Sequence, residues 1–332
     1  MSHYQLNPHI YSDTVKLEPI RAGFGRGLKK AGEKNENIVA LCADLTESTQ
    51  ISKFAEAFPA RYIEMGIAEQ NLVTVASGLA RAGKIPFTSS YAAFSPGRNW
   101  EQIRTTITLN DQPVKIVGSH AGVSVGPDGA THQMLEDIAL MRVLPNMIVI
   151  APGDSIEAEK ATLAVAENDK PTYLRLAREK TPIFSTEHSP FEIGKAYKLH
   201  DGQDVTLLGT GTMTYQLLVA ARLLKEKNIH AEVLHVPTIK PLDSETILES
   251  VRKTGRVVTA EEAQAAAGFG GAIAELLGDN LPTPLLRIGM KDRFGESGVP
   301  RELIKYFRLD GASMAEDIEQ FVAKVPRYHQ GF

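Results

Sequence analysis

Two imidazoles and one carboxylate, His120, Asp128 and His132, lie within one glycine-rich stretch of this sequence. Such groups hydrogen-bond sugar hydroxyls and move protons near neutral pH. The stretch follows an apolar run at 114–118 that predicts a strand, and open α/β sheets bind ligands at the carboxyl ends of parallel strands. A metal site and simple capping of the loop are alternatives, although the spacing of the histidines matches no standard zinc site. We therefore interpret the stretch as a binding loop that can also transfer protons.

Glu69 is a second candidate for chemistry, because it falls in the first turn of a helix predicted over 68–82. It belongs to the segment Met-Gly-Ile-Ala-Glu-Gln-Asn at 65–71. The helix dipole favours a carboxylate in a first turn, so capping is the alternative role. Position in the helix alone favours capping, and only the surrounding motif can decide otherwise.

The elements that would position these side chains alternate between strands and helices. Short apolar runs, typical of strands buried on both faces of a parallel sheet, predict strands at 37–43, 114–118, 147–151 and 172–177. Helical periodicity lies between them, at 21–31, 68–82, 99–109, 133–142 and 156–167. This alternation predicts an α/β domain with a parallel sheet and helices on both faces.

The alternation breaks at 179–192, a polar segment with two prolines, and then restarts. Strands are predicted at 204–208, 231–236 and 256–260, helices at 214–227 and 244–253, and further elements at 273–277, 285–288 and 301–307. We therefore predict two α/β domains, at 1–180 and 193–332, joined by a linker at 181–192, with the second domain the smaller. The Gly-Thr-Gly at 209–211 lacks the third glycine of a dinucleotide fingerprint, which favours a tight strand-to-helix turn.

The bulk composition excludes several classes of protein. The net charge of −4 and the pI of about 6.2 lack the basic surplus of nucleic-acid binders. No apolar run reaches the roughly 20 residues needed to span a bilayer, and residues 1–18 lack an apolar signal segment. The single cysteine, Cys42, excludes an internal disulfide and lies in an apolar run, as expected for a buried structural thiol. We expect a cytoplasmic protein that binds neither nucleic acid nor membrane.

The segment around Glu69 resembles the Gly-Ile-x-Glu motif of transketolases and their relatives. The stretch 120–133 resembles the transketolase signature H-x₃-G-x-G-x-D-G-x-T-H-Q, with Ser124 standing where the signature has its first glycine. The resemblance implies a thiamine-diphosphate-dependent transketolase, in which a pyrimidine-binding domain precedes a transketolase C-terminal domain. In that family the glutamate hydrogen-bonds the aminopyrimidine ring of the cofactor, and the ring then acts as the general base.

Further matches extend the site that the resemblance implies. Arg21 and Arg178 match family arginines, while Asp44 and Ser48 belong to a segment similar to the family motif Ala-Asp-Leu-Thr-x-Ser. By this resemblance Arg21, Ser48, His120 and Arg178 bind the sugar phosphate, and Asp44 contacts the cofactor. Guanidinium forks and neutral donors suit a phosphate, although a surface ion pair is the alternative for each arginine alone.

The remaining implied roles concern the cofactor ring and the transferred unit. The segment 86–94 aligns with the family's aromatic segment, so Phe94 would stack on the aminopyrimidine ring and Tyr91 would line the same pocket. Ordinary core packing is the alternative for both. Asp128 is implied to contact the C2 hydroxyl of the sugar, and His132 to contact the transferred unit and shuttle a proton.

One family feature is missing from the sequence. Thiamine diphosphate enzymes hold the diphosphate through a divalent cation bound by Gly-Asp-Gly and a later asparagine, and no Gly-Asp-Gly occurs here. We therefore expect a split enzyme, in which a separate N-terminal subunit supplies the diphosphate-binding domain with its Mg²⁺ or other divalent cation. This chain would carry no metal ligand, would be inactive alone, and would assemble with its partner into a heterotetramer.

Other members of this group of enzymes remain alternatives. A 1-deoxyxylulose-5-phosphate synthase normally lacks histidine at the position of His120, and 2-oxo acid dehydrogenase β subunits typically end the signature with His-Ser-Gln. A non-catalytic scaffold that only binds the partner is a third alternative, which the joint presence of Glu69, His120, Asp128 and His132 argues against. The Glu-Glu-Ala at 261–263 resembles a C-terminal-domain feature, and that domain is expected to lie far from the cofactor.

Overall fold

A seven-stranded sheet forms the centre of the first half of the chain. The computed structural model describes residues 4–328, and the strands of this sheet are β2 (Ile38–Cys42), β3 (Tyr62–Glu64), β4 (Ile85–Tyr91), β5 (Lys115–Ser119), β6 (Ile148–Ile150), β7 (Thr172–Arg175) and β12 (Thr238–Lys240). Their order is β12-β6-β7-β5-β4-β2-β3, and every neighbouring pair is parallel except β12 with β6. β2 and β5 are buried along their whole length, as expected for strands covered on both faces. The predicted parallel sheet is confirmed.

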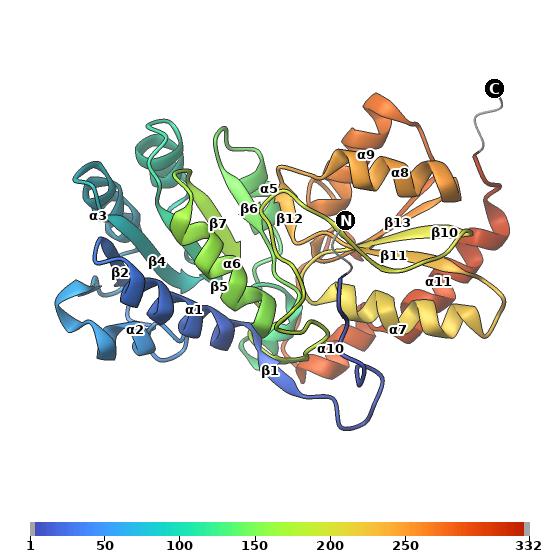
Figure 1. The fold of residues 1–332 in the computed structure, drawn as a ribbon, viewed down its shortest axis with the longest axis horizontal. Coiled ribbons are helices and arrows are strands. Elements are labelled where there is room, and N and C mark those ends of the chain that lie inside the picture. Colours follow the sequence, from blue (N-terminus) through green and yellow to red (C-terminus); the bar gives the residue numbers. More distant parts are fainter. Residues whose placement is uncertain (1–3, 329–332) are drawn as a thin grey trace.

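Helices cover both faces of this sheet, as the sequence predicted (Figure 1). The first face carries α1 (Ile20–Lys34) and α6 (Ser155–Glu167), with α2 (Ser52–Ala57) beside α1. The second face carries α3 (Glu69–Arg81), the π-helix η2 (Ile103–Thr108) and α5 (Asp137–Arg142). α1 and α6 approach each other closely because Gly23 of α1 has no Cβ, which would overlap the backbone of Ser155.

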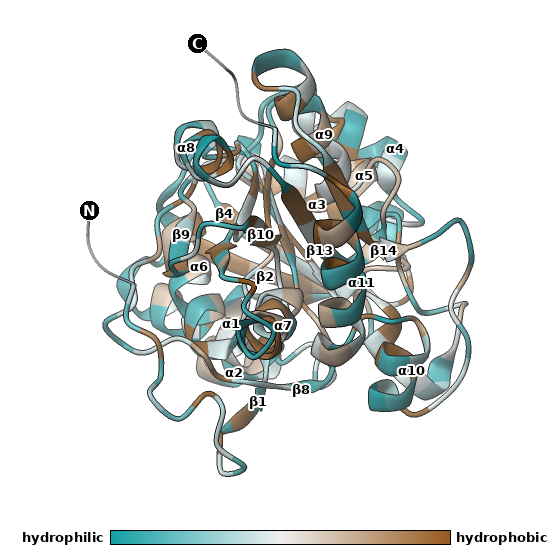
Figure 2. Ribbon diagram, turned by 90° about the vertical axis from the view of Figure 1, so that its right-hand side faces the viewer, coloured by the Kyte–Doolittle hydropathy of each residue, from teal (hydrophilic) through white to brown (hydrophobic). Residues whose placement is uncertain are grey.

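A smaller five-stranded sheet forms the centre of the second half. Its strands are β9 (Tyr197–His200), β10 (Val205–Gly209), β11 (Ala231–His235), β13 (Val257–Gln264) and β14 (Leu285–Met290), in the order β14-β13-β10-β11-β9. Only β9 is antiparallel to its neighbour. One face packs against α7 (Met213–Lys225) and α11 (Gly311–Lys324), and the other against α8 (Ser244–Thr254) and α9 (Phe269–Asn280). Figure 2 shows hydrophobic residues concentrated on the interior strands, with hydrophilic residues on the outer helices.

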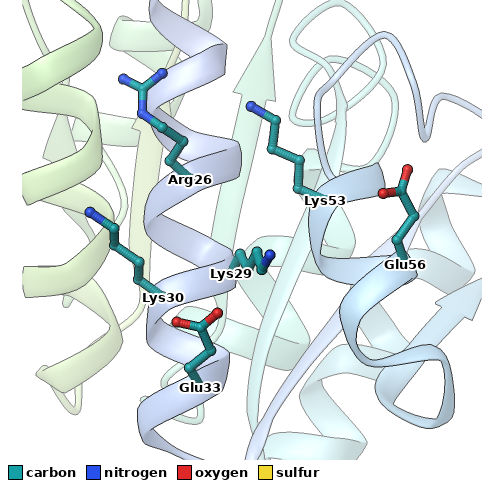
Figure 3. Close-up of a pocket in the computed structure, with 6 residues that line it drawn as sticks. All are labelled: Arg26, Lys29, Lys30, Glu33, Lys53 and Glu56. Carbon is teal, nitrogen blue, oxygen red and sulfur yellow. The ribbon is translucent and has the colours of Figure 1, made fainter.

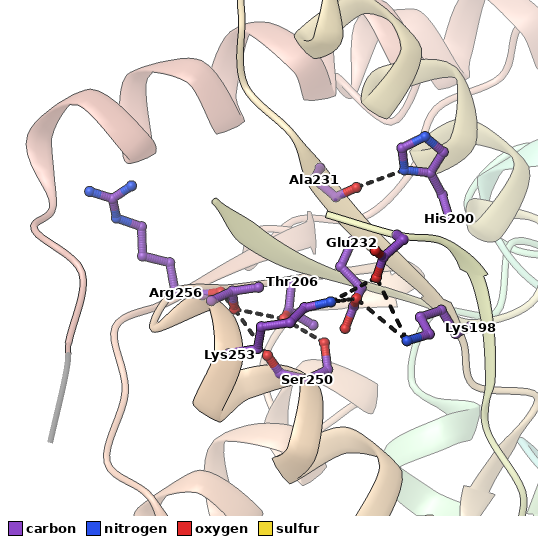
Figure 4. A network of polar contacts seen from close by, with 10 residues as sticks. Lys198, His200, Thr206, Ala231, Glu232, Ser250, Lys253 and Arg256 are labelled. Atoms are coloured by element: carbon purple, nitrogen blue, oxygen red, sulfur yellow. Dashed lines mark hydrogen bonds and ion pairs between the residues drawn. The ribbon is translucent and has the colours of Figure 1, made fainter. Parts of the chain in front are cut away.

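A polar network fastens α8 to this second sheet (Figure 4). Lys253, near the end of α8, pairs with the buried carboxylate of Glu232 on β11 and lies 2.8 Å from Asp201. Thr206 of β10 hydrogen-bonds the hydroxyl of Ser250 at 2.7 Å. These contacts satisfy polar groups that α8 would otherwise bury unpaired.

The two halves exchange segments. β12 follows β11 in the chain but pairs with β6 at the edge of the first sheet. Residues 4–15 lie instead against the segment 183–189 and against α7 of the second half, where the Tyr11 hydroxyl donates to the carbonyl of Leu218 at 3.2 Å. β1 (Leu17–Pro19) and β8 (Lys180–Pro182) form a small sheet of their own. The division into two domains with a linker at 181–192 stays a prediction, and the exchange of segments between the halves was not part of it.

Some element boundaries differ from those predicted. α5 is shorter than the helix predicted at 133–142, because Met134 pairs with Ala121 in an isolated β-bridge. The segment 99–109, predicted as one helix, consists of α4 (Trp100–Gln102) followed by the π-helix. β3, β4 and α2 were not predicted. Within residues 4–328, no helix combines the length and the apolar composition that a membrane span requires.

Candidate active site

The parallel strands bring the predicted site residues to one edge of the first sheet. Tyr91 is the last residue of β4, its register partner on β5 is Ser119, and His120 follows directly. Arg178 lies just beyond the end of β7. Arg21 and Glu69 come from the first turns of α1 and α3, two helices that precede strands of this sheet. The carboxyl edge of a parallel sheet is where such folds bind their ligands.

Four rings form a cluster at this edge. Tyr91 stacks on His120 with ring centroids 3.9 Å apart and an interplanar angle of 26°, and it stacks on Phe94 at 6.0 Å. His132 meets Phe94 edge-on, at 5.4 Å and 75°. The structure therefore joins the predicted aromatic pair to both predicted histidines and forms a wall suited to a flat ring.

Glu69 is the first residue of α3, and only 2% of it is exposed. Its Oε2 accepts a hydrogen bond from Nη1 of Arg98 at 2.7 Å, and its backbone carbonyl accepts one from the side chain of Asn99 at 2.8 Å. The Arg98 guanidinium also lies over the Phe94 ring, 4.8 Å from its centroid. Among the hydrogen bonds of residues 4–328, none involves the other oxygen, Oε1. Glu69 is thus held at the aromatic wall with one oxygen still able to bind a ligand.

The guanidinium charges of Arg21 and Arg178 act on the buried imidazole of His120. Burial, with the nearby charges of Arg21 and Arg178, lowers the pKa of His120 to about 3, so this ring is neutral at pH 7. Its Nδ1 lies 2.9 Å from the hydroxyl of Ser119. Arg21 donates to the carbonyl of Arg178, while its Nε is buried without a partner in the described part of the chain. Nε of Arg178 lies 4.0 Å from the carboxylate of Glu179. Two neighbouring guanidiniums and an unpaired buried donor are features of an anion site.

Three predicted site residues stay apart from this cluster. Asp44 is exposed after β2 and uses its backbone N–H to bind Glu64 at 2.8 Å, and Ser48 lies in the same loop. Asp128 is exposed at the end of the short helix η3 (Val123–Asp128). In the part of the chain that the structure describes, no hydrogen bond or ion pair connects the side chains of these three to the ring cluster. No group of three His, Cys, Asp or Glu residues suited to a metal ion occurs within 4–328.

Two residues of the site region were not identified from the sequence. Arg98 pairs with Glu69. In the sequence, the position of Arg98 shortly after the aromatic segment 86–94 is the feature that could have indicated its place in the site. Glu262 of β13 hydrogen-bonds the backbone of the loop between His120 and His132. The loop therefore rests directly on the second half, whose distance from the cofactor stays a prediction.

A hollow between α1 and α2 lies elsewhere (Figure 3). It is lined by Arg26, Lys29, Lys30, Glu33, Lys53 and Glu56, and none of the predicted site residues is among them. Arg26 is already paired with Glu18 and Glu159, at 2.9 and 2.8 Å. We assign no ligand to this hollow.

Fold and site together define an α/β protein that gathers a carboxylate, aromatic rings, imidazoles and guanidiniums at the edge of a parallel sheet. The profile of the transketolase pyrimidine-binding domain matches residues 19–183, and that of the transketolase C-terminal domain matches residues 194–314. A protein of Methanocaldococcus jannaschii, provisionally named a transketolase C-terminal section, is 46% identical over 317 residues, covering 93% of this chain and 99% of that protein. The chain belongs to the transketolase family.

One further relative and two solved structures are also similar to this chain. A 6-deoxy-6-sulfo-D-fructose transketolase subunit of Clostridium sp. is 42% identical over 297 residues, covering 89% of this chain and 92% of that subunit. A solved structure described as a split gene transketolase, inactive beta4 tetramer, matches with a TM-score of 0.86 and 42% identity, covering 92% of this chain and 98% of that one. The transketolase of Campylobacter jejuni shares the fold, with a TM-score of 0.80 at 22% identity, over 95% of this chain and 49% of its own.

Membership of this family implies dependence on thiamine diphosphate. The residues at the sheet edge fit the aminopyrimidine end of that cofactor. Phe94 and Tyr91 belong to the aromatic wall, and Oε1 of the buried Glu69 is an acceptor without a partner in the described residues. Of the cofactor's two ends, these side chains suit the ring.

Proposed function

We propose that this chain is the pyrimidine-binding subunit of a split, cytoplasmic transketolase, which transfers a two-carbon ketol unit from a ketose phosphate to an aldose phosphate. A separate N-terminal subunit would hold the cofactor's diphosphate and its Mg²⁺ or other divalent cation. The observation that carries the proposal is Glu69, a buried carboxylate at the start of α3 and next to the aromatic wall. A buried acid with a free oxygen beside a ring-binding face is suited to hold a proton on a heterocycle nitrogen.

The roles of the chain's own residues follow from their places. Thiamine diphosphate, when bound, supplies the nucleophilic carbon that accepts the ketol unit. Glu69 binds the proton at the ring nitrogen N1′, and Phe94 and Tyr91 pack against the ring. His132, at the edge of Phe94, contacts the transferred unit and moves a proton, and Asp128 contacts the sugar's C2 hydroxyl. Asp44 is assigned to the cofactor by the family motif alone.

The anionic end of the sugar would lie between Arg21 and Arg178, with His120 and Ser48 as further donors. The unpaired Nε of Arg21, and the guanidinium charges of Arg21 and Arg178 beside His120, support an anion at this place. A neutral imidazole can donate one hydrogen bond to such an oxygen. A sulfonate has the same tetrahedral oxygens as a phosphate, and relatives are named for sulfofructose and for apulose 4-phosphate. We therefore define the substrate class as sugars with a terminal tetrahedral anion.

The relatives support the split arrangement. The split-gene relative is described as an inactive tetramer of beta subunits alone, which agrees with a subunit that associates with itself and needs another chain for activity. Relatives from M. jannaschii and Clostridium match over nearly their whole length. We propose a heterotetramer of two subunits of each kind.

Replacement of Glu69 tests the function most simply. In the complex with its diphosphate-binding subunit, Glu69→Gln should lower kcat for ketol transfer by about 100-fold or more, the range associated with general acid–base catalysis. Assembly, measured by size-exclusion chromatography with light scattering, should be unchanged. The control is Glu101→Gln, which removes an exposed carboxylate from α4. Near-wild-type turnover of Glu69→Gln would exclude Glu69 from this role.

A further inference from the structure

A carboxylate from the second half of the molecule supports the loop that carries both histidines. Glu262 lies on β13 and is 2% exposed. Its Oε1 accepts the backbone N–H of Ser124 at 2.6 Å, and its Oε2 accepts the hydroxyl of Thr212 at 3.0 Å. Both oxygens are therefore used, one on the loop and one on the turn that leads into α7. A buried charged acceptor with two partners is a strong and directional contact.

The loop is shaped to admit this carboxylate. Gly122 has φ of +90°, and a Cβ at this position would overlap the Glu262 side chain. Its N–H bonds the carbonyl of Met134 at 2.9 Å, which closes the base of the loop, while the N–H of Ala121 bonds the carbonyl of Leu176 at 3.1 Å. His120 directly precedes Ala121 on one side of this closure, and His132 lies two residues before Met134 on the other side. A shift of the backbone at 122–124 would therefore move both rings.

Glu262 is itself held in place by the first half. Its backbone carbonyl accepts Nη2 of Arg175 at 2.8 Å, and Nε of Arg175 is 2.8 Å from the buried carboxylate of Asp137. The Tyr173 hydroxyl completes this cluster, at 2.8 Å from Asp137. The two halves are thus joined beneath the loop by a fully buried network rather than by an exposed ion pair.

We infer that Glu262 is a positioning residue, through which the second half of the molecule sets the loop geometry of His120 and His132. The inference rests on the proposed function for its consequence in catalysis. The contact by which Glu262 holds the loop does not depend on that function. It gives the C-terminal domain a part in catalysis without any contact with substrate.

Neighbouring Glu261 provides a matched control. It is also fully buried on β13, but its carboxylate accepts the N–H groups of Phe269 and Gly270 at the start of α9, each at 2.7 Å. Its removal should therefore destabilise α9 and leave the loop in place. Both variants remove a buried carboxyl side chain from β13, and they differ in the segment that each releases.

Amide hydrogen exchange of the isolated chain provides the first test. Glu262→Ala should speed exchange of the amides at 121–134 by about 10- to 100-fold, the loss expected for a hydrogen bond to a charged group. Glu261→Ala should speed exchange at 269–272 and not at 121–134. Glu262→Gln can keep one oxygen on Ser124 and turn its amide to Thr212, so it should restore slow exchange in the loop. Unchanged loop exchange in Glu262→Ala, or equal opening in Glu261→Ala, would overturn the inference.

Kinetics of the assembled complex provide the second test. Glu262→Ala should lower kcat while the affinity for thiamine diphosphate, measured by fluorescence quenching, stays that of the wild type, because Glu69 and Phe94 are not moved. A fall in cofactor affinity with unchanged kcat would contradict positioning of the histidines. If Glu262→Ala does not fold, Glu262→Asp keeps the carboxylate but withdraws it from the N–H of Ser124 by one methylene group, and unchanged loop exchange in that variant would overturn the inference. An inactive wild-type complex would refute the proposed function and leave the exchange result valid.

Discussion

His120 combines several unusual features in one residue. It is buried and stacks against Tyr91. Its backbone φ is +57°, a conformation that costs residues other than glycine about 1–3 kcal/mol. Burial, together with two guanidiniums near it, lowers the pKa of the ring and keeps it neutral. Such concentrated strain and charge are typical of binding sites, where the surrounding fold stabilises what is locally unfavourable.

The neutral state of His120 predicts a pH dependence of stability. Its pKa is about 3 when folded and 6.5 ordinarily, so between these values the unfolded chain binds a proton that the folded chain does not. Stability should therefore fall as the pH drops through 6.5 toward 3. Between pH 6.5 and pH 5, the titration of His120 lowers the free energy of unfolding by about 1.5 kcal/mol.

His120→Asn should remove that part of the loss, since asparagine tolerates the same backbone conformation without titrating. The measurement is the free energy of unfolding in urea at pH 6.5 and pH 5. His188→Asn, at an exposed histidine, serves as the control and should keep the wild-type difference. An equal pH dependence in His120→Asn and the wild type would contradict a neutral His120.

Which residues could be predicted depended on how far apart their partners are in the sequence. His120 and His132 share one distinctive stretch, so their types and spacing were sufficient to propose a site, whereas Glu69 was proposed from the resemblance of its short motif to a family. The pairing of Arg98 with Glu69 spans 29 positions, and that of Glu262 with Ser124 spans 138. Contacts over such distances depend on the fold and leave no local pattern.

At the scale of elements, strands with continuous apolar runs were predicted and mixed ones were not. β2 and β5 have apolar, buried residues and were identified. β4 contains Pro86 and the polar run Thr88-Ser89-Ser90, whose three side-chain oxygens are buried without partners among residues 4–328, so its sequence has no strand-like pattern. α5 lost its predicted first turn to the β-bridge that closes the loop.

The turn at Gly122 should be the least tolerant position of the loop. Gly122→Ala combines a left-handed backbone with overlap of the Glu262 carboxylate, and should lower the free energy of unfolding by more than about 1 kcal/mol. Gly278→Ala is the control, because it lies exposed in α9 with free space around it and should stabilise by about 0.5–1 kcal/mol. Urea unfolding of both variants measures the difference. A Gly122→Ala variant as stable as the wild type would show that the loop does not require this geometry.

At the scale of the whole molecule, each half supports the other. The first half supplies the ring cluster, the second supports its loop, and β12 crosses from the second half to the edge of the first sheet. The site so formed suits the ring end of thiamine diphosphate, and the sequence has no Gly-Asp-Gly motif for the diphosphate end. The account therefore requires that the two ends of one cofactor be held by two different polypeptides.

Ketol transfer from xylulose 5-phosphate to ribose 5-phosphate, with thiamine diphosphate and Mg²⁺, tests that requirement most directly. The assay would use this chain alone, a diphosphate-binding subunit that contains Gly-Asp-Gly alone, and a mixture in which the complex is confirmed by light scattering. We predict turnover only in the mixture. Turnover by this chain alone, or a confirmed complex that consumes pyruvate and transfers no ketol unit, would contradict the account.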